Sequence, residues 1–392
     1  MSNYNLSIVV VTRNDNHGLN LNERTNRFID SCSYMSLKHK VFIELIIVEW
    51  NPPKTNDSLD KLISGMLPNN NQYLTTRIIT VPPKIHDQFK NSKNLNLFQM
   101  IGKNVGIRRA KGEFVLATNI DIIFSDEIFI NIKRGFNKNT LYRCARFDVP
   151  EEFAFQKKPE LLLNNCKKGF RAINSRFGTY KINEKINKRF LSRMSLPIKI
   201  KFLILLFLIK RSFSYFIKLF NLKKLFNLKK LFNLKKLFNL KKLYFFISNL
   251  FFKKNSNKVG YLKAHILNCL FFTNACGDFT LMDRASWNDL KGYFEFPIYS
   301  LHIDSFLLFQ AFYKKIQIKN LSDSVIFHID HSLGSGYSIA GEELLFSNLK
   351  KKKIPYIDYQ EYIRIVNKIK MNELLPEEGW GLSKHYFKES VL

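Results

Sequence analysis

Acidic side chains are missing from one long part of the chain. Residues 185–277 contain 21 lysines and arginines but no aspartate or glutamate. The rest of the sequence holds 41 basic and 32 acidic side chains, so most of the net charge of +30 belongs to this basic segment. The charge therefore indicates a local basic feature and not a fold that is basic throughout. Lysine, asparagine, isoleucine and phenylalanine are abundant everywhere, as A/T-rich coding DNA would give, so part of the basicity can be codon drift.

Long apolar runs and paired cysteines are also lacking. The longest wholly apolar stretch of the basic segment is residues 202–209, which is too short to cross a bilayer. The five cysteines are odd in number and none has metal-ligand spacing, which favours free thiols in a reducing compartment. Only five residues precede the first predicted strand, residues 6–12, so we expect no signal peptide. We therefore expect a cytoplasmic protein, either free or peripheral on the inner face of a membrane.

Glycine and proline are absent from a hexapeptide repeat, Lys-Leu-Phe-Asn-Leu-Lys, which occurs four times in residues 218–241. On a helix each copy is rotated by about 240° from the one before, so lysine and apolar residues spread around the whole circumference. This excludes a coiled coil, which needs a period of seven, and predicts one long basic helix. Three explanations of this segment stay open. It is a repeat that expanded in the gene and is tolerated, or residues 199–258 attach to an anionic membrane surface, or the segment binds nucleic acid. No nucleic-acid motif accompanies the repeat, which makes the last the weakest.

The rest of the chain is organised around residues 104–126. A helix stops at Gly112, and the apolar run 114–117 predicts a strand buried on both faces. Asn119 and Asp121 follow at the carboxyl end of that strand, where open α/β sheets bind ligands. A carboxylate there can hold a divalent cation, which in turn can hold a diphosphate. The alternative is that Asp121 caps the next helix, a role for which Ser125 is better placed.

This stretch resembles the middle of nucleotide-sugar glycosyltransferases of the GT-A fold, in the broad family 2 group. Those enzymes carry a helix ending in Asn-x-Gly-x-x-x-Ala-x-Gly-Glu, a strand, and an Asp-x-Asp-like motif. The matching residues here are Asn104, Gly106, Ala110, Gly112, Glu113 and Asn119-Ile120-Asp121, with asparagine at the first acidic position. The resemblance covers about residues 1–135 and 275–335.

The resemblance implies an α/β fold of the GT-A, Rossmann-like type. Its sheet would be mixed but mainly parallel and flanked by helices, with a long basic helical insertion. Four parts would follow one another: a nucleotide-sugar-binding half at 1–135, a variable insertion at 136–275, an acceptor and catalytic half at 276–335, and a helical C-terminal region at 336–392. The last part looks surface-exposed, and we assign no chemistry to it.

The resemblance also implies the nucleotide and metal positions. The residues expected to bind the nucleotide are Thr12, Arg13, Glu49, Asn104 and Asn119. Asp121 would hold Mg²⁺ or Mn²⁺, helped by His331, which lies in a loop after the predicted strand 324–329. From the residues alone, His328 and His331 lie three apart next to Asp330, and both could be metal ligands. His331 is the better match to the family, because His328 alternates into the strand and has packing as its alternative role. Glu49 has a second interpretation, in which it only caps a turn.

A second informative stretch spans residues 276–305. By resemblance, Asp278 would line the donor sugar, and His302 stands where the family has an acidic residue near the sugars. Asp304 opens a helix and is the candidate general base, because transfer to a hydroxyl needs a carboxylate within hydrogen-bond reach of it. Such a residue can equally be a cap that compensates the helix dipole. Glu295 is the weaker alternative base.

Some other polar residues are given ordinary roles. His86 lies in a predicted loop, where a solvated role is favoured over contact with the donor or acceptor. Lys103, Arg108 and Arg109 could meet phosphate, but a solvated helix face is the favoured interpretation. The resulting hypothesis is an enzyme that moves a sugar from a nucleoside diphosphate sugar to a hydroxyl of a glycan or a lipid-linked acceptor, in surface polysaccharide biosynthesis. The rival is a non-catalytic membrane- or nucleic-acid-binding protein on a degenerate transferase fold. A nucleotidyltransferase would need a Gly/Arg-rich loop after the first strand, and residues 13–18 fit that poorly.

Overall fold

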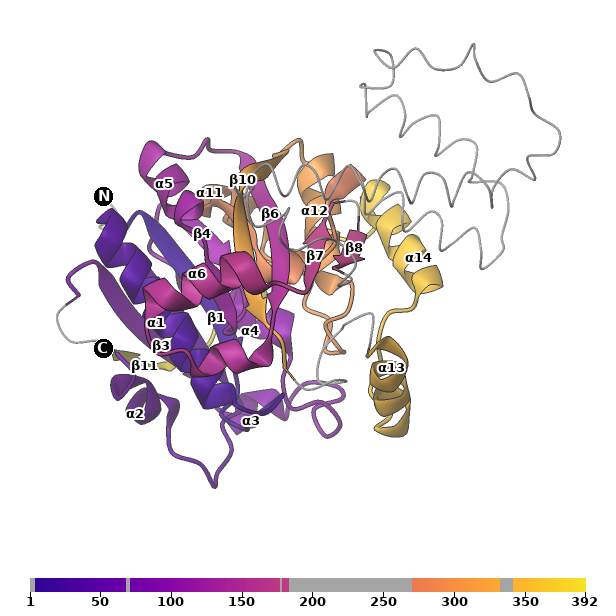
Figure 1. The fold of residues 1–392 in the computed structure, drawn as a ribbon. Helices are drawn as coiled ribbons and strands as arrows, with labels where there is room; N and C mark the ends of the chain where they lie inside the picture. The colour runs from indigo at the N-terminus through magenta and orange to yellow at the C-terminus, as the bar shows by residue number, and fades with distance from the viewer. Residues whose placement is uncertain (1–3, 68–70, 177, 183–269, 332–340) are drawn as a thin grey trace, which may run out of the picture.

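A computed structural model describes the chain apart from residues 1–3, 68–70, 177, 183–269 and 332–340 (Figure 1). The hexapeptide repeat and the helix expected for it lie outside the described residues. The described residues form a mixed 11-stranded sheet with helices on both faces. The α/β class expected from the sequence is confirmed.

Six strands of the sheet are parallel to one another, and they set the position of any site. They are β3 (Leu74–Val81), β2 (Ile43–Trp50), β1 (Leu6–Thr12), β4 (Phe114–Ala117), β6 (Thr140–Val149) and β10 (Gln317–Ile329). Four strands run the other way: β9 (Thr280–Asp283) between β4 and β6, β5 (Ile122–Phe124) beside β10, β11 (Lys388–Val391) beside β3, and β7 (Ala172–Ser175) beside β6. The short strand β8 (Gly178–Lys181) pairs antiparallel with β7. The carboxyl ends of the six parallel strands therefore share one edge of the sheet.

Each face of the sheet has its own apolar core, because successive side chains of a strand point to opposite faces. In β1, Leu6, Ile8 and Val10 enter one core and Val9 and Val11 the other. The first face is covered by α1 (Leu21–His39), α2 (Leu59–Ser64), α5 (Asp126–Arg134) and α6 (Pro159–Gly169). The second face is covered by α3 (Pro83–His86), α4 (Gln99–Arg109), α11 (Arg284–Leu290), α12 (Ile303–Tyr313) and α14 (Tyr359–Lys370). α13 (Glu342–Lys351) packs in a third, smaller cluster.

Glycines let α4 lie unusually close to the sheet. A Cβ on Gly106 would come within 2.5 Å of Val9 Cγ1, and one on Gly112 within 2.5 Å of the Ser7 backbone nitrogen. Real Cβ atoms do not approach other atoms this closely, so these positions need glycine for packing. Part of the motif that carries the family resemblance therefore has a purely structural reason.

Two parts of the expected domain organisation differ from the sheet observed. Strand β6 lies inside 136–275, yet it pairs with β9 and β10, so the expected boundary at 135 does not fall at an edge of the sheet. The C-terminal region contains helices, α13 and α14, as expected, but it is neither helical throughout nor exposed throughout. Near its end β11 pairs with β3 (Figure 1). Trp380 is only 3% exposed. Both departures depend on pairing between distant segments.

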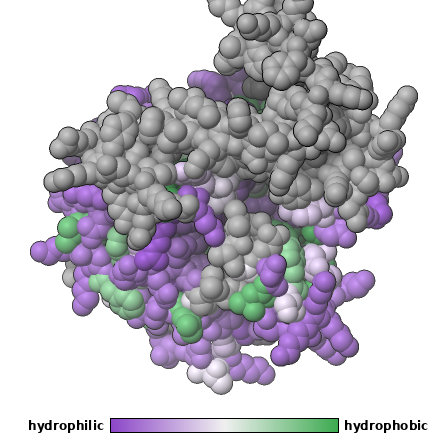
Figure 2. All heavy atoms as spheres, turned by 45° about the vertical axis from the view of Figure 1, so that its right-hand side comes forward, coloured by the Kyte–Doolittle hydropathy of each residue, from purple (hydrophilic) through white to green (hydrophobic). Residues whose placement is uncertain are grey.

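The surface of the described residues is mainly hydrophilic on the face shown in Figure 2, with apolar residues in small separate patches. Large exposed apolar side chains such as Leu37, Leu161 and Leu344 lie on different helices. In the part of the chain that the structure describes, no helix combines the length and apolar character that crossing a bilayer requires.

Candidate functional site

Strand register brings the carboxyl ends of distant segments together. In β10, His328 stands beside Asp148 of β6 and beside Ile122 of β5. Asp121 immediately precedes Ile122, and its carbonyl accepts a hydrogen bond of 3.1 Å from the Ile329 backbone N–H. The site is therefore assembled by pairing of strands that lie almost two hundred residues apart.

Asp121 is the centre of a cluster that can hold a metal ion. Its Oδ2 lies 3.6 Å from His331 Nε2, 3.7 Å from His328 Nε2 and 3.1 Å from Arg24 Nη1. The Asp121 side chain is 9% exposed, and within the described part of the chain its Oδ1 has no hydrogen-bond partner. One ligand atom from each of Asp121, His328 and His331 lies within 4.8 Å of the other two. A buried carboxylate oxygen without a partner and two nearby imidazoles fit a divalent cation.

The electrostatics of the cluster favour an ionised Asp121 and a neutral His331, which are the forms that ligate a metal ion, but favour the protonated form of His328. Burial by itself would raise the pKa of Asp121, but the positive charges of His328, His331 and Arg24 outweigh it and hold that pKa below its usual range. Burial lowers the pKa of His331 to about 4, which leaves a neutral imidazole. Burial would also lower the pKa of His328, but the Asp121 carboxylate opposes it and the net pKa is raised.

Of the two interpretations of His328, the structure favours the one that groups it with possible metal ligands over simple packing in the strand. Its second ring nitrogen, Nδ1, lies 3.4 Å from Asp148 Oδ1 and 3.8 Å from Asp330 Oδ1. His328 therefore joins Asp121 on one side to two further carboxylates on the other. Sequence reasoning also missed Arg24, and no pattern in the predicted helix distinguishes it from a surface arginine.

Beside this cluster lies a second polar group around Asp278. Asn119 Nδ2 donates to Asp278 Oδ1, and Arg146 Nη1 donates to Asp278 Oδ2 at 2.6 Å. Asn119 Oδ1 accepts from Lys103 Nζ at 2.8 Å and from Gln99 Nε2 at 3.0 Å. The expected donor-site residues Asn119 and Asp278 are thus in direct contact.

Lys103 was wrongly assigned to a solvated helix face. It is fully buried, and its Nζ also donates to the Gly277 carbonyl at 2.7 Å. Burial lowers its pKa to about 8, against the opposing charges of Asp278, Asp304 and Asp121. The structure therefore places one buried cation among three carboxylates.

Asp304, the candidate base, stands in the first turn of α12 close to Gly277. A Cβ on Gly277 would lie 2.8 Å from Asp304 Oδ2, so glycine is needed there for the carboxylate to approach. Burial raises the pKa of Asp304, opposed by a hydrogen bond from Cys276 and by the Lys103 charge. The helix begins at Ile303 with His302 as its N-cap, so Asp304 is the second residue of the helix and not its cap. A carboxylate with a raised pKa near a donor-site group is suited to accept a proton.

Arg13 and Thr12 lie at the carboxyl end of β1. Thr12 is buried, and Arg13 Nε donates to the Asn51 carbonyl at 2.7 Å while Nη1 pairs with Asp15 at 2.7 Å. Arg13 is therefore already held by the loops that follow β1 and β2. Both residues remain at the edge where the sequence placed them.

Glu49 has internal partners for both carboxylate oxygens. Oε1 accepts from the Leu59 backbone N–H and Oε2 from Thr80 Oγ1, each at 3.2 Å. These contacts correspond to the capping alternative, at the start of α2.

His86 is buried and not solvated as expected, and its Nδ1 accepts a hydrogen bond from Trp50 Nε1 at 2.9 Å.

Asn104 and Glu295 form a clamp away from the metal cluster. Asn104 Nδ2 donates to the Tyr293 carbonyl and to Glu295 Oε1, both at 2.8 Å, and Asn104 Oδ1 accepts from the Tyr293 N–H. Glu295 Oε1 also accepts from the Gly381 N–H at 2.7 Å. This clamp ties α4 to the loop before α12 and to the C-terminal segment.

His302 is held among aromatic rings. Its ring centroid lies 4.8 Å from that of Tyr362 and 5.5 Å from that of Tyr359. Burial lowers its pKa to about 4, so the imidazole is neutral at physiological pH. The ring contacts described for His302 are with these tyrosines, and its carbonyl accepts a hydrogen bond from Ser305 Oγ at 2.7 Å.

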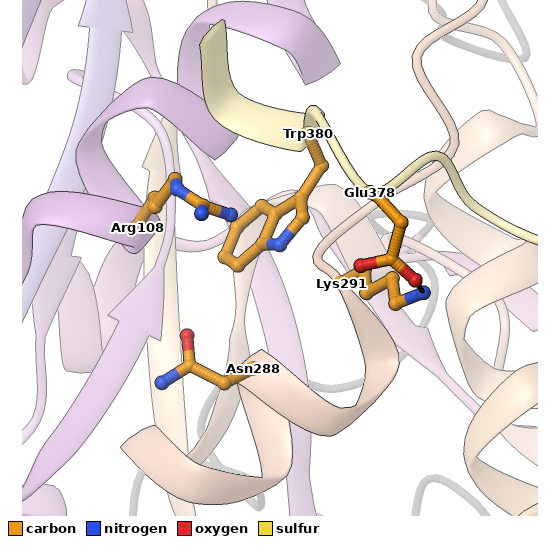
Figure 3. Close-up of a pocket in the computed structure, with 5 residues that line it drawn as sticks. All are labelled: Arg108, Asn288, Lys291, Glu378 and Trp380. Carbon is orange, nitrogen blue, oxygen red and sulfur yellow. Dashed lines mark hydrogen bonds and ion pairs between the residues drawn. The ribbon is translucent and has the colours of Figure 1, made fainter. Parts of the chain in front are cut away.

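A shallow pocket lies at the other end of α4 from Gln99 (Figure 3). It is lined by Arg108, Asn288, Lys291, Glu378 and Trp380. The Arg108 guanidinium lies over the Trp380 ring, 4.9 Å from its centroid, and Lys291 is ion-paired with Glu378. The Arg108 and Lys291 cations that line this pocket therefore already have partners.

Arg109 was expected on a solvated face, but it donates to three backbone carbonyls of the C-terminal segment.

Comparison with protein-family models and with curated protein sequences gives no match.

Proposed function

We propose that the chain is a glycosyltransferase of the GT-A, family 2-like type, which moves a sugar from a nucleoside diphosphate sugar to a hydroxyl acceptor. One observation carries the proposal. Residues that the family resemblance selects from separate parts of the sequence, Asn119, Asp121, Asp278, Asp304 and His331, lie together at the carboxyl edge of the parallel strands. In an open α/β sheet this edge is where ligands bind.

The residues divide into two roles. Asp121 and His331 would hold Mn²⁺ or Mg²⁺, and the ion supplies charge stabilisation for the leaving diphosphate. Asp304 accepts the proton of the acceptor hydroxyl as the new glycosidic bond forms and the bond to the diphosphate breaks. Asp278 is oriented by Asn119 and Arg146, so its carboxylate is fixed for hydrogen bonds to sugar hydroxyls.

The acceptor and the location follow from the resemblance alone. A glycan or a lipid-linked sugar is the acceptor we propose, in surface polysaccharide assembly on the cytoplasmic side of a membrane. Attachment to anionic lipid through residues 199–258 is part of the same proposal.

The test is calorimetric titration of the purified full chain with UDP and GDP, with and without Mn²⁺. We expect metal-enhanced binding of one nucleotide, weakened in Asp121→Ala. Asp304→Asn should keep nucleotide binding and lose transfer to a sugar acceptor. If a folded protein binds no nucleoside diphosphate under any of these conditions, the donor assignment is wrong and the rival, a binding protein on a transferase-like fold, is favoured. Full transfer by Asp304→Asn would remove this residue as the base.

A further inference from the structure

The two groups of metal-binding side chains at the sheet edge share one residue. One group is Asp121, His328 and His331, and the other is Asp148, His328 and Asp330. His328 contributes a different ring nitrogen to each group: Nε2 faces Asp121 and Nδ1 faces Asp148. A neutral imidazole carries one proton, so one nitrogen can ligate while the other donates.

We propose that Asp121, His328 and His331 form a three-ligand site for a transition-metal ion, and that Asp148 fixes His328 for this role by accepting its Nδ1–H. Metal-bound histidines usually donate their second N–H to a carboxylate, which sets the tautomer and the ring orientation. The inference rests on the metal site of the proposed function, to which it adds a ligand, a positioning residue and a metal preference.

Asp148 is itself held in place for this contact. Arg146 Nε lies 2.9 Å from Asp148 Oδ1, and Asn174 Nδ2 donates to Asp148 Oδ2 at 2.8 Å. Register sets the approach, because His328 and Asp148 are neighbours across the β6–β10 pair. Asp330 is the weaker partner, at 3.8 Å and with a side chain 42% exposed.

Asp121 is also held in place by an arginine. Arg24 is 2% exposed and holds Asp121 Oδ2, while Oδ1 is the oxygen without a described partner. Carboxylate ligands are commonly hydrogen-bonded through the oxygen that is not on the metal. Oδ1 is therefore open to an ion, and Oδ2 lies 3.7 Å from His328 Nε2 and 3.6 Å from His331 Nε2, so both carboxylate oxygens are close to the proposed site.

The donor set predicts which ion is preferred. Two imidazoles and one carboxylate suit Mn²⁺, Fe²⁺, Co²⁺ or Zn²⁺, whereas Mg²⁺ prefers oxygen ligands in a near-ideal octahedron. We expect Mn²⁺ and Zn²⁺ to bind the metal-free protein, with Mg²⁺ displacing Mn²⁺ only at an excess of about 100-fold or more.

The experiment measures Mn²⁺ binding to the full chain, without nucleotide, by the loss of the free-ion signal in electron paramagnetic resonance, with Mg²⁺ and Zn²⁺ as competitors. Asp148→Asn should weaken Mn²⁺ binding by about 10- to 100-fold. His328→Ala should weaken it at least as much. Asp330→Asn makes the same charge change on the weaker partner and should alter affinity by less than about threefold.

Arg146→Gln distinguishes a structural role of Asp148 from its proposed role in holding His328. This variant removes the ion pair between Arg146 and Asp148 but leaves the contact between Asp148 and His328. Thermal melting confirms that each variant is folded. The proposal is overturned if Mg²⁺ competes as well as Zn²⁺, if Asp148→Asn binds Mn²⁺ normally, or if Arg146→Gln loses as much affinity as Asp148→Asn. Normal Mn²⁺ binding by a protein that binds no nucleoside diphosphate would keep this inference and overturn the proposed function.

Discussion

Glu295 provides a direct test of how much the burial of an ionised carboxylate lowers the stability of this fold. Its Oε1 accepts hydrogen bonds from Asn104 Nδ2 and from the Gly381 N–H. Burial raises the pKa of Glu295 to about 6, from an ordinary value of 4.5. At about 1.36 kcal/mol per pKa unit, keeping this carboxylate ionised costs the fold about 2 kcal/mol.

The sign of the pH dependence follows from the raised pKa. Between pH 4.5 and 6 the folded chain binds more protons at Glu295 than the unfolded chain does. The contribution to stability is therefore fully present below pH 4.5 and is lost as the pH rises through 6. Other carboxylates titrate identically in wild type and in a Glu295 variant, so the difference between the two proteins isolates this group.

Glu295→Gln keeps an amide oxygen for the two donors and removes the charge. We expect it to unfold at higher urea concentration than wild type at pH 7.5, with a gain of about 1–2 kcal/mol that disappears as the pH falls below 4.5. Glu295→Ala is the matched variant that leaves Asn104 and Gly381 without their acceptor. Each lost buried hydrogen bond costs about 1–3 kcal/mol, so this variant should be less stable than Glu295→Gln by at least about 2 kcal/mol.

The reasoning is refuted if Glu295→Gln is less stable than wild type at pH 7.5, or if the difference between them does not depend on pH. The same variant also separates the two candidate bases. Glu295→Gln should retain transfer, since its carboxylate belongs to the clamp, and lost transfer in a stable protein would identify Glu295 as the base.

Two further predictions concern packing and charge. Gly106→Ala should destabilise the chain by about 1–3 kcal/mol in urea unfolding, because its Cβ would meet Val9 Cγ1 at 2.5 Å; wild-type stability would show that α4 can move off the sheet. Arg24→Gln leaves the buried Asp121 carboxylate without its guanidinium partner and should cost about 3 kcal/mol. Mn²⁺ at 100 times its Kd should return about 2.7 kcal/mol, measured by thermal melting, and an unaltered melting temperature with Mn²⁺ would contradict the metal site.

Local pattern was enough to place most of the helices and strands. Strand β1 has the predicted limits 6–12, and β4 has the limits 114–117 of its apolar run. Ser125, which the sequence favours as the cap of the following helix, is the N-cap of α5, and that helix begins at Asp126. The short strand β5 at Ile122–Phe124 was not predicted, because it is defined by its pairing with the distant β10.

The sequence by itself determined that Asn119 and Asp121 lie at the carboxyl edge of the parallel strands, because buried parallel strands align their carboxyl ends. Only the tertiary structure decided that His328 turns to Asp121 and Asp148, that Lys103 is buried, and that the C-terminal segment closes on β3. Helix stops and strand alternation are local and can be read from neighbouring residues. Partners depend on the register between distant strands and on which charges become buried together, and neither is encoded within a short window of sequence.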